Sequence, residues 1–201
     1  MTAAPGDSSD IGYGAEVRRK LLHLVALIIP SGYYWAGRWP SVVVVFFFFC
    51  SSLFDDLARL RRWPIRSLWC PWVDPIVRPK ESTGFTGATH ILLSGWLCPL
   101  LFVMPAAAIG MVAIILGDIA AALVGRRWGK HPLGNNRTLE GSLAFLMAAG
   151  LGGLLVPGVP VALALGAALL ATAVEALSTR IDDNLTVPLA VGLAVHLALV
   201  L

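Results

Sequence analysis

Four carboxylates in a mostly apolar chain have the residue types and spacing to hold a divalent cation. Asp118 lies inside an apolar stretch, eight residues before Arg126. At a rise of about 1.5 Å per residue, this spacing places it roughly 12 Å from the charged end of a helix. An ionised carboxylate at that depth in a membrane needs a cation or a metal to compensate it, so the side chain should face the bundle interior. A structural carboxylate bonded to neighbouring helices is the alternative interpretation.

The other three carboxylates occur together near the C-terminal end. Glu175 and Asp182 are seven residues apart and share one face of a continuous helix. Asp183 and Asn184 follow, and such oxygen ligands suit Mg²⁺, which typically uses one or two carboxylates plus substrate phosphates. Solvated acids at a helix C-terminus are the alternative, although they would oppose the helix dipole. If the last three residues instead open the final helix as N-caps, a metal role remains compatible.

A glycine-rich basic loop between residues 125 and 142 has the composition of a phosphate-binding segment. It is not a Walker A loop, because Gly125 and Gly129 are one residue closer than that motif requires. Backbone N–H groups near glycine and several cations can still hold a polyphosphate, and the N-terminus of the next helix favours an anion. A basic loop that only sets membrane orientation is the alternative. The candidates for phosphate binding are Arg126, Arg127, Lys130, Arg137, Glu140, Gly141 and Ser142.

Two further polar clusters precede apolar stretches. The first has the spacing i, i+3, i+4 and i+7, which puts its members on one helical face: Glu16, Arg19, Lys20 and His23. The second lies before and within the third apolar stretch: Lys80, Glu81, Thr86 and His90. Contact with a phosphate or a lipid headgroup is the functional interpretation. Membrane anchoring, hydrogen bonds between helices and buried core histidines are the structural alternatives.

The elements that must position these residues are membrane helices. The chain has 201 residues, of which 57% are hydrophobic and 13% charged, with a mean hydropathy of +0.78. This composition excludes an ordinary soluble domain. Five stretches carry no charged residue: 21–37, 39–54, 82–117, 141–174 and 184–201.

The lengths of these stretches predict about seven transmembrane helices. A bilayer needs about 20 apolar residues per helix, so the third and fourth stretches each suit a helical hairpin. Pro99 and Pro105 could turn the third, and Pro157, Gly158 and Pro160 the fourth. We therefore expect an all-α, polytopic integral membrane bundle. A polar N-terminal tail at 1–15 would precede a single membrane-embedded catalytic domain at 16–201.

The charges predict the orientation of this bundle. Of the fifteen Lys and Arg residues, only Arg38 falls on the second face, and all twelve Asp and Glu residues lie on the first. Excess Lys and Arg marks the cytoplasmic side. This bias also accounts for the net charge of +3 without a nucleic-acid partner. We expect a cytoplasmic N-terminus, a C-terminus on the opposite side and an active site at the cytoplasmic interface.

The ordered set of clusters resembles the CTP-dependent prenol kinases, the family of dolichol kinase and phytol kinase. The resemblance covers nearly the whole chain from residue 16 onward. One departure is Arg137, three residues before Glu140, where that family more usually has a lysine. The matching motifs are Glu-x-x-Arg-Lys-x-x-His at 16–23, Glu81 with Thr-Gly-Ala-Thr at 86–89, Gly-Asp-x-Ala-Ala at 117–121, Gly-Arg-x-x-Gly at 125–129, Glu-Gly-Ser-Leu-Ala at 140–144, and Glu175 with Asp-Asp-Asn-Leu-x-x-Pro at 182–188.

The resemblance implies transfer of the γ-phosphate of CTP to the hydroxyl group of a membrane isoprenoid alcohol. Mg²⁺ and the catalytic role are assigned to Asp118, Glu175, Asp182 and Asp183. Binding of the nucleotide or its phosphates is assigned to Lys20, Lys80, Arg126, Arg127, Lys130, Arg137, Glu140, Gly141, Ser142 and Asn184.

Three other functions remain as alternatives. A phosphatidate cytidylyltransferase would share CTP, Mg²⁺ and the membrane, but its long signature ending in a Gly-Gly and Asp-Arg run is missing from this sequence. A diacylglycerol kinase would differ only in the acceptor. A small transporter with intramembrane carboxylates is the non-enzymatic alternative, although it would have little use for the glycine-rich basic loop.

Overall fold

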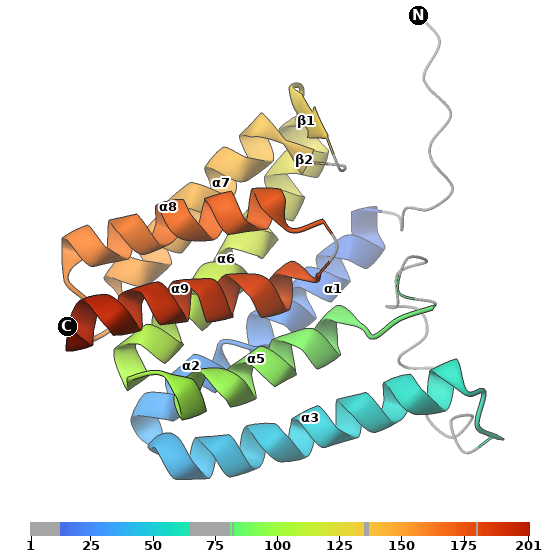
Figure 1. Ribbon diagram of the computed structural model, residues 1–201. Helices are drawn as coiled ribbons and strands as arrows, with labels where there is room; N and C mark the ends of the chain where they lie inside the picture. Colours follow the sequence, from blue (N-terminus) through green and yellow to red (C-terminus); the bar gives the residue numbers. More distant parts are fainter. Residues whose placement is uncertain (1–12, 65–80, 82, 135–136, 180) are drawn as a thin grey trace, which may run out of the picture.

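The computed structural model describes residues 13–64, 81, 83–134, 137–179 and 181–201. Apolar helices dominate it, and they run back and forth between two ends of a bundle (Figure 1). The helices are α1 (Tyr13–Val25), α2 (Ile28–Trp35), α3 (Arg38–Leu60), α5 (Gly87–Leu101), α6 (Met104–Trp128), α7 (Leu139–Leu154), α8 (Val161–Leu177) and α9 (Asp183–Val200). Two short strands, β1 (Pro132–Gly134) and β2 (Arg137–Thr138), lie between α6 and α7.

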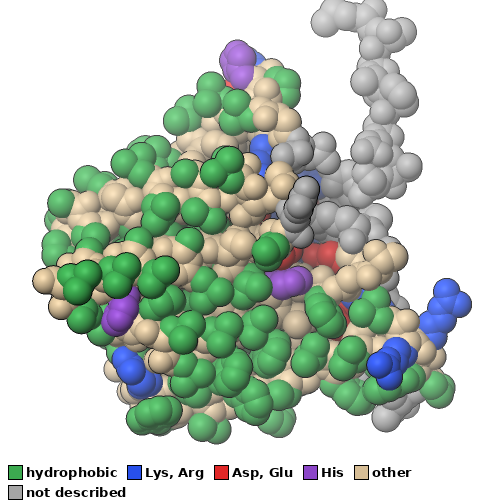
Figure 2. Space-filling view, in the orientation of Figure 1, with side chains coloured by type: hydrophobic (Ala, Val, Ile, Leu, Met, Phe, Trp, Pro, Cys, Tyr) green, Lys and Arg blue, Asp and Glu red, His purple; other side chains and the backbone are tan. Residues whose placement is uncertain are grey.

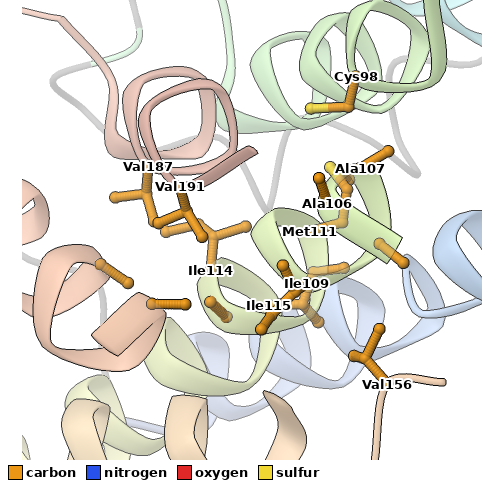
Figure 3. Packing of buried hydrophobic residues seen from close by; sticks show 14 of the residues in the cluster. Cys98, Ala106, Ala107, Ile109, Met111, Ile114, Ile115, Val156, Val187 and Val191 are labelled. Carbon is orange, nitrogen blue, oxygen red and sulfur yellow. The ribbon is translucent and has the colours of Figure 1, made fainter. Parts of the chain in front are cut away.

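Helix α6 is the centre of the bundle. It packs against α1, α2, α5, α7, α8 and α9, and its residues 106–111 and 113–115 are buried. Figure 3 shows Val187 and Val191 of α9 pointing toward Ile114 of α6. The centrality of α6 matters for function because this helix also carries Asp118.

The two predicted hairpins are present, with one change in the first turn. The chain turns at Phe102 and Val103, which have extended backbones, and Pro105 lies in the first turn of α6. Pro99 does not turn the chain, because it is buried inside α5. Between α7 and α8, Gly158 adopts a φ of +81°, a conformation that glycine accommodates without strain.

The first predicted transmembrane helix is interrupted. It consists of α1 and α2, separated at Ala26 and Leu27, where the backbone N–H groups bond to carbonyls three residues back. Helix α1 begins at Tyr13, and the division into a tail at 1–15 and a catalytic domain at 16–201 stays a prediction. With α1 and α2 taken as one broken segment, the described residues contain the seven helical segments that the sequence predicts.

The all-α prediction misses a small β-hairpin in the glycine-rich loop. Strands β1 and β2 pair antiparallel, with Pro132 opposite Thr138 and Gly134 opposite Arg137. Thr138 then caps α7, because its hydroxyl accepts a hydrogen bond from the Gly141 N–H at 3.1 Å. The strand pairing and this cap fix Arg137 next to the start of a helix.

The helices have membrane-like lengths and compositions. By these two properties, α3, α6 and α9 are long and apolar enough to cross a bilayer, and α5, α7 and α8 are shorter apolar helices. Figure 2 shows hydrophobic side chains over most of the visible face, with acidic side chains close to the start of α9. These properties are those of a membrane-embedded bundle. Its sidedness remains a prediction from the charges.

The chain order brings the predicted polar clusters to one end of the bundle. The first residues of α1, α5, α7 and α9 and the last residues of α3, α6 and α8 all lie at that end (Figure 1). Each cluster precedes or follows a helix at this end, so alternation of the helix direction is enough to gather them.

We expect Gly110→Ala to destabilise the bundle, because a Cβ at this position would lie 2.6 Å from the Pro188 carbonyl oxygen of α9. Crowding of this kind typically costs about 1–3 kcal/mol. Gly166→Ala in α8 is the matched control, since a Cβ there meets no atom within 4 Å. Thermal unfolding in detergent should show a lower Tm for Gly110→Ala alone. Equal Tm values would contradict the close packing of α6 and α9.

Candidate functional site

Asp118 pairs with two residues of α1. Its Oδ2 atom accepts a short hydrogen bond from the Lys20 ammonium group and lies 3.6 Å from His23 Nε2. Lys20 is only 3% exposed, whereas the Asp118 side chain is 23% exposed. The sequence predicts that Asp118 faces the bundle interior and meets a cation, and the ion pair with Lys20 has that arrangement.

Glu16 gathers three cations from two helices. Its carboxylate is fully buried and lies 3.8 Å from Lys20 Nζ and 3.8 Å from Arg19 Nη1. Arg126, at the end of α6, approaches the other oxygen at 3.7 Å. One carboxylate thus connects the α1 cluster to the first cation of the glycine-rich loop. Two of these cations also pair with other carboxylates, Lys20 with Asp118 and Arg19 with Glu81.

Helices α1, α5 and α9 meet at Gly87. A Cβ at this residue would lie 3.0 Å from Arg19 Nη2 and 3.2 Å from Asn184 Nδ2. Glu81 Oε1 accepts hydrogen bonds from Arg19 Nη2 and from the Gly87 N–H, both at 3.2 Å. Because Asn184 Nδ2 also donates to Asp182 Oδ1 at 2.7 Å, the start of α9 joins the same cluster. Gly87 leaves the space in which the three polar groups converge.

Asp56 on α3 supports this cluster, although the sequence analysis did not select it. Its buried carboxylate accepts hydrogen bonds from the Thr86 N–H at 2.8 Å and from the Thr89 hydroxyl at 2.6 Å. It also accepts from Arg59 at 2.9 Å, and Arg59 donates to the Glu81 carbonyl at 2.8 Å. Asp56 therefore fixes the segment that carries Glu81. One feature of the sequence could have indicated this role. Asp56 lies three residues before Arg59, just after an apolar stretch, a spacing that allows an ion pair on one helical face.

Arg137 joins three elements at the other side of the site. Its Nε donates to Glu175 Oε1 at 2.6 Å, and its Nη2 lies 3.5 Å from Asp183 Oδ2. The same guanidinium donates to the carbonyls of Ala176 at 2.9 Å and Ser178 at 3.2 Å. A planar, multidentate donor suits this arrangement, because a lysine ammonium cannot reach all four acceptors.

The acids of α6, α8 and α9 are close enough to interact. The Asp183 carboxylate experiences the negative charges of Asp118, Asp182 and Glu175. Asp182 also acts as the N-cap of α9, since its carboxylate accepts from the Asn184 N–H at 3.0 Å. Within the described ranges, no three His, Cys, Asp or Glu side chains already have the arrangement of a metal site. A site that used one or two of these carboxylates and the phosphates of a substrate would still fit this donor set.

Some predicted site residues lie apart from these contacts. Arg127 and Lys130 are exposed, and the Arg127 guanidinium lies 5.3 Å from the centre of the neighbouring Trp128 ring. Glu140, in the first turn of α7, pairs at 2.7 Å with His131, just before β1, outside the cluster of acids.

Three other predicted site residues have packing or hydrogen-bond contacts that do not reach the cluster of acids. Gly141 permits close packing of α7 on α6, since a Cβ there would lie 3.1 Å from the Ala121 carbonyl oxygen. Ser142 is partly buried near the start of α7. The His90 ring bonds to the Thr86 carbonyl at 2.9 Å, which is consistent with its structural interpretation. Lys80 lies outside the described residues.

Comparisons with known proteins give two relatives. No known protein-family model matches the chain, and no solved structure matches it. The chain is 29% identical over 184 residues to the uncharacterized protein RP860 of Rickettsia prowazekii, covering 87% of this chain and 90% of that protein. It is 27% identical over 135 residues to CTP-dependent diacylglycerol kinase 1 of Schizosaccharomyces pombe, covering 64% of this chain and 61% of that kinase. This second relative, like the prenol kinases that the sequence resembles, is a CTP-dependent kinase that acts on a lipid. Its lipid is diacylglycerol, whereas that of the prenol kinases is an isoprenoid alcohol.

We expect Arg137→Lys to lower the free energy of unfolding by about 1–3 kcal/mol, because the buried Glu175 carboxylate and the carbonyls at the end of α8 would lose donors. Arg127→Lys is the matched control, since the exposed Arg127 contacts none of these acceptors. Chemical denaturation in detergent measures both variants. Equal stability of the two would show that the contacts of Arg137 contribute little to the fold.

Proposed function

We propose that this protein is a CTP-dependent lipid kinase that phosphorylates the hydroxyl group of an isoprenoid alcohol in the membrane. The observation that carries the proposal is the cluster of buried and half-buried cations and carboxylates at one end of an apolar bundle. Lys20 and Asp118 lie at one side of it, and Arg137, Glu175 and Asp183 at the other. The similarity to a CTP-dependent diacylglycerol kinase supports CTP as the donor.

A site at the end of a membrane bundle suits the two substrates of such a reaction. A lipid alcohol reaches the site from within the bilayer, while a charged nucleotide approaches from water. Phosphoryl transfer depends mainly on positioning and on neutralising the charge of the phosphates. Arg19, Lys20, Arg126 and Arg137 carry positive charge at this end of the bundle, and they would contact the phosphates by exchanging their present carboxylate partners.

Asp118 and Asp183 are the best candidates to hold Mg²⁺, with Glu175 and Asp182 nearby. The carboxylates of Asp118 and Asp183 are partly exposed, and the Asp183 carboxylate is within electrostatic range of Asp118. When bound, Mg²⁺ would supply positive charge that neutralises the negative charge developing on the phosphates during transfer. Lys20 and Arg137 already neutralise the same acids, so they are placed to exchange partners with the metal and the phosphates.

The proposed reaction is a direct displacement at the γ-phosphorus of CTP. The alcohol oxygen forms a bond to this phosphorus as the bond to the β–γ bridging oxygen breaks. CDP leaves with the bonding electron pair, and the hydroxyl proton passes to one of the carboxylates of Asp118, Glu175 or Asp183. Arg137 lies against two of these acids and is placed to orient the transferred group.

Diacylglycerol is the second candidate acceptor, favoured by the 27% identity to the diacylglycerol kinase of S. pombe. The chemistry of the site would be the same, because both acceptors present a hydroxyl group at the membrane surface. A screen of purified protein with CTP or ATP against farnesol, a long polyprenol and dioleoylglycerol separates the candidates. Release of CDP from CTP supports a kinase. A parallel reaction with phosphatidic acid as the acceptor tests the cytidylyltransferase alternative, and release of pyrophosphate in that reaction would overturn the proposal.

We expect Asp118→Asn to reduce phosphorylation of the alcohol by roughly 100-fold or more, since it removes both a metal ligand and a potential proton acceptor. Asp55→Asn, a carboxylate of α3 to which we assign no role, is the matched control and should retain wild-type activity. Size-exclusion chromatography and circular dichroism establish that both variants are folded. Normal turnover by folded Asp118→Asn would remove Asp118 from the mechanism.

We also expect EDTA to abolish phosphorylation and added Mg²⁺ to restore it. The Tm without nucleotide should change little, because Lys20 and Arg137 neutralise the acids in the absence of a metal. Parallel activity and thermal-unfolding measurements check both expectations. Full activity in EDTA would exclude the proposed magnesium site.

A further inference from the structure

A groove opens between the end of α8 and the start of α9, beside the proposed kinase site. It has a volume of about 370 Å³ and is lined by Val174, Leu177, Ser178, Thr179, Ile181 and Thr186. The two helix ends lie side by side in Figure 1. Leu177 and Ile181 are exposed on the apolar outer surface of the bundle. The groove therefore communicates with the space that lipid chains occupy around a membrane protein.

Two of the three hydroxyl-bearing residues that line the groove, Ser178 and Thr186, present an apolar surface to a ligand. The Ser178 hydroxyl donates to the Val174 carbonyl at 2.8 Å and lies 2.7 Å from the Thr186 hydroxyl. Because these groups satisfy one another and the backbone, they leave mainly methyl and methylene groups at the surface of the groove. With Leu177 and Ile181, they form a surface suited to a hydrocarbon chain.

The groove borders the proposed kinase site. Val174 and Ser178 precede and follow Glu175, whose Oε1 atom is bonded to Arg137 at 2.6 Å. The other oxygen of Glu175 is buried and has no hydrogen-bond partner among the described residues. Arg137 also donates to the Ser178 carbonyl at 3.2 Å, so its guanidinium touches a residue of the groove as well as the acids. Glu175 does not line the groove, so a hydroxyl group at this end would lie next to the helix turn that carries this acceptor.

We infer that this groove binds the first part of the hydrocarbon chain of the acceptor and directs its hydroxyl group toward Glu175. This inference rests on the proposed function. The groove volume is near the lower end of ligand sites, which span roughly 300–1,000 Å³. That size favours an acceptor with one chain, an isoprenoid alcohol, over a diacylglycerol with two acyl chains next to its hydroxyl group.

A kinetic experiment tests whether the acceptor occupies the groove by filling part of the groove with a larger side chain. Val174→Phe should raise the KM for farnesol in mixed micelles by about tenfold and leave the KM for CTP nearly unchanged, because it fills apolar space without touching the phosphate site. Leu169→Phe is the matched control, since Leu169 is an exposed residue of α8 outside the groove. An unchanged KM for farnesol in active Val174→Phe would overturn the inference.

A labelling experiment tests binding without relying on catalysis. Ile181→Cys and Leu169→Cys are treated with a maleimide, and mass spectrometry measures the label at each substituted position. Farnesol should slow labelling of Ile181→Cys alone, and dioleoylglycerol at the same mole fraction should not. Equal labelling with and without farnesol, or protection by dioleoylglycerol alone, would overturn the inference.

The two experiments separate failure of the groove from failure of the proposed function. If wild-type protein phosphorylates farnesol with CTP but farnesol does not protect Ile181→Cys, the kinase function stands and the groove is wrong. If farnesol protects Ile181→Cys but no alcohol is phosphorylated, the alcohol-binding groove stands and the kinase function is wrong.

Discussion

The mutual neutralisation of buried charges at one end of the bundle is the interaction on which the rest of the structure depends. Hydrocarbon does not hydrate an ionised side chain, so each carboxylate in such surroundings needs a cation or hydrogen-bond donor from a neighbouring helix. Lys20 with Asp118 joins α1 to α6, and Arg137 with Glu175 joins the β-hairpin to α8. These pairs hold helices whose other faces are simply apolar. They also create a place where phosphates and a metal find partners of both signs.

Much of this arrangement follows from patterns in the sequence. Apolar stretches of limited length interrupted by proline and glycine predict the hairpins α5–α6 and α7–α8. Alternating helix directions then bring Asp118, Glu175 and Asp183 to the same end. The i, i+3, i+4 and i+7 spacing of Glu16, Arg19, Lys20 and His23 predicts a shared helical face, and the ion pairs of this segment are on α1. These features could be predicted from two properties of the sequence alone. One is the spacing of residues along a helix, and the other is the alternation of direction between successive membrane helices.

Other features depend on contacts between distant residues, which local patterns do not contain. The role of Asp56 is one such feature, because its partners Thr86 and Thr89 are thirty or more residues away. The interruption between α1 and α2, by contrast, has a local signal in Pro30, which has no N–H group to bond the Ala26 carbonyl four residues earlier. Among the loop cations, only the fold distinguishes Arg137, which reaches the acids, from Arg127, which lies on a tryptophan ring.

The short helices have a consequence for the surrounding bilayer. Helices α5, α7 and α8 have 15, 16 and 17 residues, so at about 1.5 Å per residue they are roughly 22–26 Å long. The hydrocarbon core of a typical bilayer is about 30 Å thick, and a membrane thins around hydrophobic segments that are too short. Lipid headgroups and water would therefore be drawn inward beside these helices. Such local thinning would reduce the depth at which a carboxylate such as Asp118 must remain ionised and shorten the path of a water-soluble nucleotide.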